Sequence, residues 1–273
     1  MKKKAVAVVM TAVMALGMVS AVSVQAGIED KTLIVGFDAE YPPYGYMDEN
    51  GEYTGFDLEL AQAVCDLEGW ELEKKPINWD SKDMELNSGS IDCIWNGFTM
   101  NGREDDYTFS EPYVDNSQVI VVADDSGIEK LTDLAGKTVG VQAASAALDL
   151  LQSEEEGGQK ELADTFGALN EFADYNTAFT ELQAGALDAL AIDVGVAKYQ
   201  LNSRGEGFKI LDETLNTEQY AIGFKKGNQE LCGKASAYLR TDSGICRSVS
   251  PSGQRRGCLL YTSPSPRDTE RSR

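Results

Sequence analysis

The feature that most constrains the fold is an alternation between short apolar runs and segments with helical periodicity. Residues 32–37 (TLIVGF) form a short run with β-branched residues, which predicts a strand. Apolar residues then repeat at helical spacing within 55–67, which predicts a helix. We expect a strand at 70–76, a helix at 82–88 and a strand at 91–95 to follow. This order predicts a mostly parallel sheet with helices on its faces.

A second block repeats the alternation further along the chain. We expect strands at 117–123, 138–141, 187–192 and 220–224, and helices at 146–152, 176–184, 196–202 and 228–239. The two blocks meet near 113–118 without a Pro-, Gly- or Ser-rich spacer, and domains joined directly by strands move as a hinge. The expected fold class is therefore α/β, with two lobes joined by two hinge strands.

The N-terminal segment has the pattern of an export signal. Three lysines precede a long apolar run, and Val24 and Ala26 are small residues at positions −3 and −1. We expect residues 1–26 to be a signal peptide cleaved near Ala26, with a retained membrane anchor as the alternative. No cysteine lies near this cut, so nothing indicates a lipoprotein. The expected location is the periplasm or the extracellular face of a bacterial membrane.

The composition of the chain changes at residue 240. Seven of the nine arginines lie in 240–273, and no lysine does. We interpret 246–273 as a non-native sequence, joined by a frameshift or fusion, with a basic disordered tail as the alternative. With this tail set aside, we expect lobe I to span 27–114 and 219–245, and lobe II to span 115–218.

Charge and composition exclude several classes of function. The net charge is −21, so we expect no nucleic-acid partner, because phosphate binding needs a basic face. The chain has no histidine, which excludes Ser-His-Asp and Cys-His catalysis and disfavours catalytic zinc. We therefore expect neither a metal nor another cofactor. Cys65 and Cys93 lie in apolar runs, which favours buried free thiols, and no spacing among the five cysteines assigns a disulfide.

The stretch SIDCIWNGFTMNGRE carries a candidate ligand contact near its end. Arg103 is one of only two arginines before residue 240, and a guanidinium matches a carboxylate with two parallel hydrogen bonds. The turn from Asn96 to Thr99 follows a predicted strand, and ligands of α/β sheets bind at such ends. Gly97 lets the backbone approach a ligand closely, and Thr99 adds a hydroxyl. The alternative for Arg103 is a surface ion pair with an acidic residue at 104–106.

Two further segments at strand ends carry suitable polar groups. Asp193 ends the predicted strand LDALAID, where its carboxylate could hold an ammonium group or could cap the next helix. The segment QAASA runs from Gln142 to Ala146 and opens a helix, whose backbone N–H groups can bind an anion. Ser145 contributes a hydroxyl to the same loop.

Three more residues follow the ends of strands in the first block. Asp38 ends the first strand, and Tyr41 and Trp79 could enclose a ligand side chain between their rings. Two rings and one carboxylate suit a cationic group. The alternative for each aromatic residue is packing in the core.

Five segments of this chain together resemble one family. They are, in order, VGFDAEYPPYGYMDENGEYTGFDLELAQAV, SIDCIWNGFTMNGREDDYTFSEPYVDNSQV, KTVGVQAASAA, LDALAID and QYAIGFKKG. In this register they resemble the polar amino-acid-binding proteins that serve ABC importers, the solute-binding proteins of family 3. The resemblance covers about residues 30–245.

The resemblance implies a periplasmic-binding-protein type 2 fold, a free amino acid as ligand, an ABC permease as partner, and a monomer without catalytic activity. It implies that Arg103 binds the ligand carboxylate, with backbone contacts at Gly97, and that Asp193 binds the ammonium group. It also implies that the loop at 142–146 completes the carboxylate clamp from the other lobe. An acid at position 38 suits lysine, arginine or ornithine, and the same pocket would equally hold glutamine, histidine or cystine.

Two other functions are compatible with such a fold. One is a secreted dehydratase, in which Asp38 or Glu40 would have to act as the base. The other is the ligand-sensing domain of a receptor, which requires a transmembrane segment and a signalling domain beyond residue 245.

Overall fold

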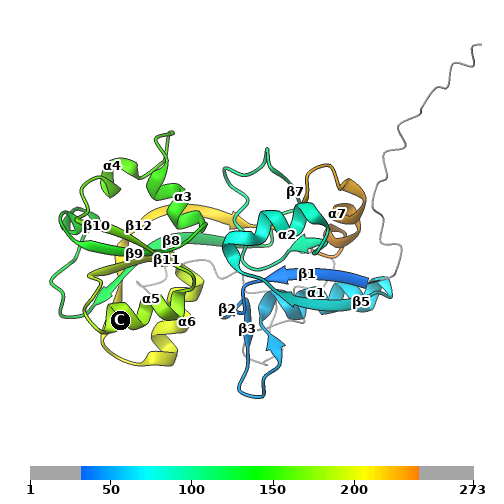
Figure 1. Cartoon of the computed structure of the whole chain (residues 1–273), viewed down its shortest axis with the longest axis horizontal. Coiled ribbons are helices and arrows are strands. Elements are labelled where there is room, and N and C mark those ends of the chain that lie inside the picture. Colours follow the sequence, from blue (N-terminus) through cyan, green and yellow to red (C-terminus); the bar gives the residue numbers. More distant parts are fainter. Residues whose placement is uncertain (1–31, 240–273) are drawn as a thin grey trace, which may run out of the picture.

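The computed structural model describes residues 32–239, which form two lobes lying side by side (Figure 1). The predicted two-lobed α/β class is confirmed. The signal peptide at 1–26, the tail at 246–273, Cys246 and Cys258 lie outside the described residues, so those predictions stay as they are.

Lobe I is built on a five-stranded sheet in the order β5-β1-β6-β13-β7. Its strands are β1 (Thr32–Phe37), β5 (Glu71–Pro76), β6 (Cys93–Ile94), β7 (Tyr107–Phe109) and β13 (Gly223–Lys225). Its helices are α1 (Phe56–Glu68), η1 (Trp79–Ser81), α2 (Lys82–Ser88) and α7 (Gln229–Ser236). A small antiparallel sheet of β2 (Glu40–Tyr41), β3 (Gly45–Met47) and β4 (Tyr53–Thr54) projects from this lobe (Figure 1).

Lobe II is built on a second five-stranded sheet in the order β10-β9-β11-β8-β12. Its strands are β8 (Val114–Ala123), β9 (Thr138–Gln142), β10 (Ala168–Phe172), β11 (Ala189–Asp193) and β12 (Phe208–Tyr220). Its helices are η2 (Leu131–Leu134), α3 (Ala146–Gln152), α4 (Lys160–Ala163), α5 (Tyr175–Gln183) and α6 (Val194–Arg204).

The two sheets are mixed, so the expectation of mostly parallel sheets holds only for part of each. In lobe I, β5, β1 and β6 pair in parallel, and β13 pairs antiparallel with β6 and β7. In lobe II, β10, β9 and β11 pair in parallel, and β8 pairs antiparallel with β11 and β12. The reason is the connection between lobes. Strands β8 and β13 enter their sheets as the chain arrives from the other lobe, and they run against their neighbours.

Strands β8 and β12 form the connection between the lobes (Figure 1). They pair antiparallel from Val114 opposite Tyr220 to Ala123 opposite Phe208, with register shifts around Thr214. The predicted lobe boundaries, at 114/115 and 218/219, fall within these two strands and stay a prediction.

The sequence did not indicate β12, and the single strand predicted at 220–224 is wrong. Tyr220 ends β12, and Gly223 begins β13 in the other lobe. The register shifts interrupt the alternation of buried and exposed residues that would otherwise mark a long strand.

The largest hydrophobic cluster is shared by both lobes. It includes Phe37 from lobe I and Phe179 from lobe II. Tyrosine rings join the two halves, since the Tyr41 and Tyr175 ring centres lie 6.0 Å apart. The two lobes are therefore in contact, which corresponds to a closed arrangement.

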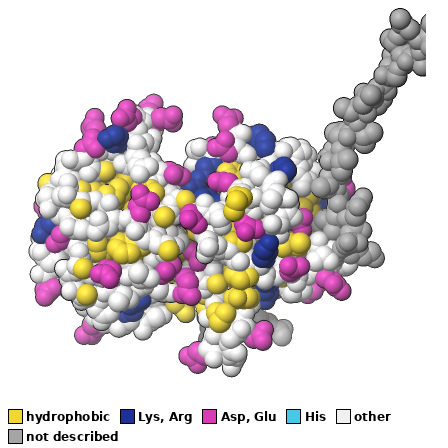
Figure 2. Space-filling model, viewed as in Figure 1, with side chains coloured by type: hydrophobic (Ala, Val, Ile, Leu, Met, Phe, Trp, Pro, Cys, Tyr) yellow, Lys and Arg dark blue, Asp and Glu magenta, His cyan; other side chains and the backbone are white. Residues whose placement is uncertain are grey.

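The cysteines within 32–239 are all free and buried, so the prediction of buried thiols at Cys65 and Cys93 is confirmed. None of the helices in this range is both long and apolar enough to span a bilayer. Acidic side chains are scattered over both lobes on the face drawn in Figure 2.

Candidate functional site

One pocket between the lobes brings together most of the residues predicted to bind a ligand. Its lining comprises Tyr41, Trp79, Gly97, Thr99, Arg103, Gln142, Ser145, Ala146 and Asp193. Two predicted residues, Asp38 and Asn96, lie outside this lining. The structure thus shows proximity, and the role of these residues as ligand contacts stays a prediction.

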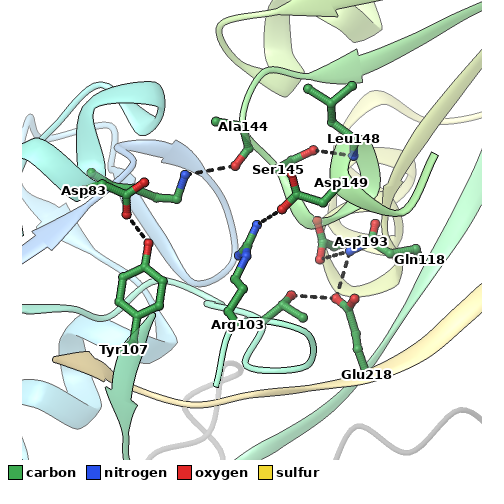
Figure 3. A network of polar contacts seen from close by, with 12 residues as sticks. Asp83, Arg103, Tyr107, Gln118, Ala144, Ser145, Leu148, Asp149, Asp193 and Glu218 are labelled. Carbon is green, nitrogen blue, oxygen red and sulfur yellow. Dashed lines mark hydrogen bonds and ion pairs between the residues drawn. The ribbon is translucent and has the colours of Figure 1, made fainter. Parts of the chain in front are cut away.

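Arg103 reaches from lobe I toward lobe II. Its Nη2 donates to Asp149 Oδ2 at 2.6 Å, and Asp149 belongs to α3 (Figure 3). The guanidinium carbon lies 5.1 Å from the centre of the Phe98 ring. The Arg103 side chain is only 12% exposed, and none of the ion pairs in residues 32–239 joins it to an acid at 104–106. Arg103 is therefore not the surface pair that was the alternative.

Asp193 is buried at the end of β11 and is surrounded by hydrogen-bond donors. Its Oδ1 accepts from Gln118 Nε2 at 2.7 Å, Asn116 Nδ2 at 2.8 Å and the Tyr220 hydroxyl at 2.6 Å. The Tyr175 hydroxyl donates to its Oδ2 at 3.4 Å. Asp193 precedes α6, yet its side chain makes no capping hydrogen bond to that helix. The helix-cap alternative is therefore not what this carboxylate does.

A second buried carboxylate, Glu218, lies on the hinge strand β12 beside Asp193 (Figure 3). Its Oε1 accepts from Asn116 Nδ2 at 2.7 Å, Gln118 Nε2 at 2.8 Å and Thr99 Oγ1 at 2.8 Å. Burial raises the pKa of Glu218 to about 6, and the nearby Asp193 charge adds to the rise.

Strand register explains why these polar groups meet. Gln118 lies opposite Asp193 in the pairing of β8 with β11, and Asn116 lies opposite Glu218 in the pairing of β8 with β12. Because side chains alternate along a strand, Asn116 and Gln118 share one face of β8. Sequence reasoning missed Glu218, because its strand was not predicted.

The loop between β9 and α3 contributes from lobe II. The Ser145 hydroxyl accepts from Leu148 N at 3.2 Å and so caps α3. Ala144 takes a positive φ of 53°, which is uncommon for a residue with a side chain. Its carbonyl accepts from Lys82 Nζ of lobe I at 3.0 Å. Burial lowers the pKa of Lys82, and the nearby Arg103 charge lowers it further.

The aromatic residues both line the pocket and pack against neighbours. Trp79 meets Phe98 edge to face at 5.8 Å between ring centres, and Lys82 Nζ lies 5.4 Å from the Trp79 ring centre. The Tyr41 hydroxyl lies 3.3 Å from that of Tyr220. The rings of Trp79 and Tyr41 thus line the pocket and also pack against neighbouring side chains.

Asp38 lies outside the pocket lining and contacts one of its residues, Gln142. Its Oδ2 accepts from Gln142 Nε2 across the lobes at 2.7 Å, and its Oδ1 accepts from Glu40 N at 2.8 Å. Burial raises the pKa of Asp38 to about 6.

Asn96 is also outside the pocket lining. Its side chain is buried near Gly45, and its amide group has no hydrogen-bond partner among residues 32–239.

Gly97 occupies a position that only glycine fits. Its φ is +57°, and an added Cβ would lie 2.8 Å from the Tyr41 ring. The Gly97 N–H donates to the buried Asp57 at the start of α1. Burial raises the pKa of Asp57 to about 7. Asp57 therefore fixes the backbone of the pocket loop, a role that the sequence pattern did not reveal.

Comparison with known proteins establishes the family. The family model of the bacterial extracellular solute-binding proteins, family 3, matches residues 33–241, so the chain belongs to this family as predicted. The arginine-binding extracellular protein ArtP of Bacillus subtilis is 34% identical over 214 residues, covering 77% of this chain and 80% of that protein. The L-cystine-binding protein TcyJ of Escherichia coli is 29% identical over 231 residues, covering 80% and 84%.

Solved structures show the same fold. An ABC uptake transporter substrate-binding protein from Streptococcus pneumoniae with bound histidine has a TM-score of 0.75 and 32% identity, covering 83% of this chain and 94% of that one. An ancestral arginine-binding protein bound to glutamine has a TM-score of 0.68 and 37% identity, covering 77% and 90%.

These matches confirm the predicted function class. The family consists of extracellular proteins that bind a solute. The matches therefore do not favour the dehydratase alternative. No group of side chains suited to a metal ion occurs within residues 32–239.

Proposed function

We propose that this protein binds a free polar or cationic L-amino acid outside the cytoplasm and delivers it to the permease of an ABC importer. The observation that carries the proposal is one pocket lined from both lobes that holds the Arg103 guanidinium and the Asp193 carboxylate. A zwitterion needs one group of each sign, and the relatives bind arginine and cystine.

In the proposed complex, Arg103 binds the ligand carboxylate and Asp193 binds the ammonium group. The Ser145 hydroxyl and the Ala146 backbone N–H, at the start of α3, complete the carboxylate site. A ligand that touches both lobes stabilises the closed arrangement by its differential affinity for that state. The contact of Arg103 with Asp149 supports this proposal, because it joins the two lobes.

Recognition of the ligand side chain falls to Tyr41, Trp79 and the pair formed by Asp38 and Gln142. Aromatic faces and a carboxylate suit a cationic group, and the Gln142 amide suits a polar one. The candidate ligands are therefore arginine, lysine, ornithine, histidine, glutamine and cystine.

We further propose that the protein acts as a monomer without turnover and is exported by cleavage near Ala26. Relatives with extracellular and periplasmic names support the location.

A thermal-shift screen of the purified protein against these six compounds tests the proposal. A ligand that binds only the folded state stabilises it by about 2.7 kcal/mol at a hundredfold excess over Kd. We expect a shift with at least one compound, lost in Arg103→Ala and in Asp193→Ala. Absence of a shift with all six and with the other standard amino acids, from a folded protein, would refute it.

A further inference from the structure

We propose that Glu218 is a positioning residue of the ligand site and forms, with Asp193, a buried carboxylate pair that receives the ammonium group of the amino acid. This inference rests on the proposed function and adds to it a residue on the hinge and a linked proton.

The geometry of the pair is defined by two shared amides. Asn116 Nδ2 lies 2.8 Å from Asp193 Oδ1 and 2.7 Å from Glu218 Oε1. Gln118 Nε2 lies 2.7 Å and 2.8 Å from the same two oxygens. Each NH₂ group therefore bridges both carboxylates. Loss of Glu218 would release the amides that orient Asp193.

Glu218 also connects this pair to lobe I. The Thr99 hydroxyl lines the pocket and donates to Glu218 at 2.8 Å. One hinge residue thus holds a lobe I side chain and, through the amides, a lobe II carboxylate. The geometry needed for the ammonium group consequently depends on β12 as well as on β11.

The charges around the pair leave it in need of a cation. Asp193 and Glu218 are each only 4% exposed. The six ion pairs formed within residues 32–239 include neither of them. Among residues 32–239, the titratable side chains found next to Glu218, apart from Asp193, are Tyr175 from α5 and Tyr220 from its own strand, and neither carries positive charge. Buried charges without a counter-ion are costly, and an ammonium group would offset that cost.

A consequence for binding follows from the acidity of Glu218. Burial and the Asp193 charge raise the pKa of Glu218 to about 6, so this carboxyl group is partly protonated at a pH near 6. A bound ammonium group favours the ionised form and lowers that pKa. Binding near this pH should therefore release a proton, and affinity should rise as the pH increases through this range.

Titration calorimetry in two buffers of different ionisation enthalpy counts this proton. L-Arginine and L-glutamine serve as probes, and the Asp38→Asn protein serves as background, because the pKa of Asp38 is also raised to about 6. In that background we expect release of about half a proton per bound amino acid near pH 6, and almost none near pH 8. Adding Glu218→Gln should abolish the release and weaken binding about tenfold.

The outcomes separate this inference from the proposed function. Binding with the same release in the Asp38→Asn protein and in the Asp38→Asn, Glu218→Gln protein would overturn the role of Glu218 alone. No binding of these or the other candidate amino acids by the unmodified protein would overturn both. If the double variant does not fold, Glu218→Asp in the Asp38→Asn protein replaces it, because the shorter side chain keeps the acid but moves it away from the two amides. A change in the pH profile of proton release supports the pair, and an unchanged profile contradicts it.

Discussion

The two charged ends of the proposed ligand site are built in different ways. Asp193 is buried and receives four hydrogen bonds from residues on β8, β12 and α5. Within residues 32–239, Arg103 has one oppositely charged partner, Asp149, whose side chain is 60% exposed and lies in the other lobe. The ammonium end is thus held rigidly by strand register, whereas the carboxylate end is assembled by contact between lobes. Changes at the first end should therefore cost more than changes at the second.

The largest effect is expected for Asp193→Asn. Removing one partner of a buried charge pair costs about 2–5 kcal/mol, so the Kd for the best amino acid should rise by about thirtyfold to several thousandfold. Titration calorimetry measures this change. The control is Asp212→Asn, which makes the same substitution at an exposed position and should leave Kd unchanged. Equal Kd values for the two variants would show that Asp193 does not hold the ligand.

Arg103→Lys should have the next largest effect. Lysine keeps the charge but loses the two parallel hydrogen bonds to a carboxylate, for a loss of about 2 kcal/mol, or roughly thirtyfold in Kd. Arg204→Lys provides the matched control, because Arg204 lies on α6 and donates to Gln200. A loss larger than that of Asp193→Asn would reverse the proposed ranking of the two ends.

Asp38→Asn tests the side-chain end. If arginine is a ligand, its affinity should fall about tenfold, while glutamine affinity should change little. Because the pKa of Asp38 is raised to about 6, the carboxylate is ionised above this pH and neutral below it. Within the Glu218→Gln background, arginine affinity should fall as the pH drops through about 6, and the additional Asp38→Asn change should remove that dependence. A persistent pH dependence would assign it to another group.

The smallest effect is expected for Asp149→Asn. An ion pair with an exposed partner contributes at most about 1 kcal/mol, so Kd should change less than about fivefold. The same measurement at high salt should narrow the difference from the unmodified protein, since exposed pairs are screened. A change comparable to that of Arg103→Lys would mean that Asp149 is essential for closure.

Local sequence patterns were sufficient to predict the ligand candidates that follow strands. Arg103 and Asp193 each follow or end a strand of the predicted sheets, and α/β folds bring such positions to one edge. The strand-and-helix alternation was clear enough to define the fold class. These predictions needed only the pattern of residues within short segments of the chain.

Residues whose partners lie in the other lobe could not be predicted in this way. Lys82 donates to Ala144, 62 positions away, and Arg103 pairs with Asp149, 46 positions away. Glu218 depends on the register of β12, a strand whose bulges hide its periodicity. Such contacts depend on how the lobes meet and on the register of paired strands. A local sequence pattern predicts neither of these.

The most direct test of the central claim compares free and blocked amino acids. Equilibrium binding to the unmodified protein would be measured for L-arginine, its methyl ester and its N-acetyl derivative, and for the same three forms of L-glutamine. If Arg103 binds the carboxylate and Asp193 the ammonium group, each blocked form should bind at least about thirtyfold more weakly than the free amino acid. An ester or N-acetyl derivative that binds as tightly as the free amino acid would contradict the two-charge site.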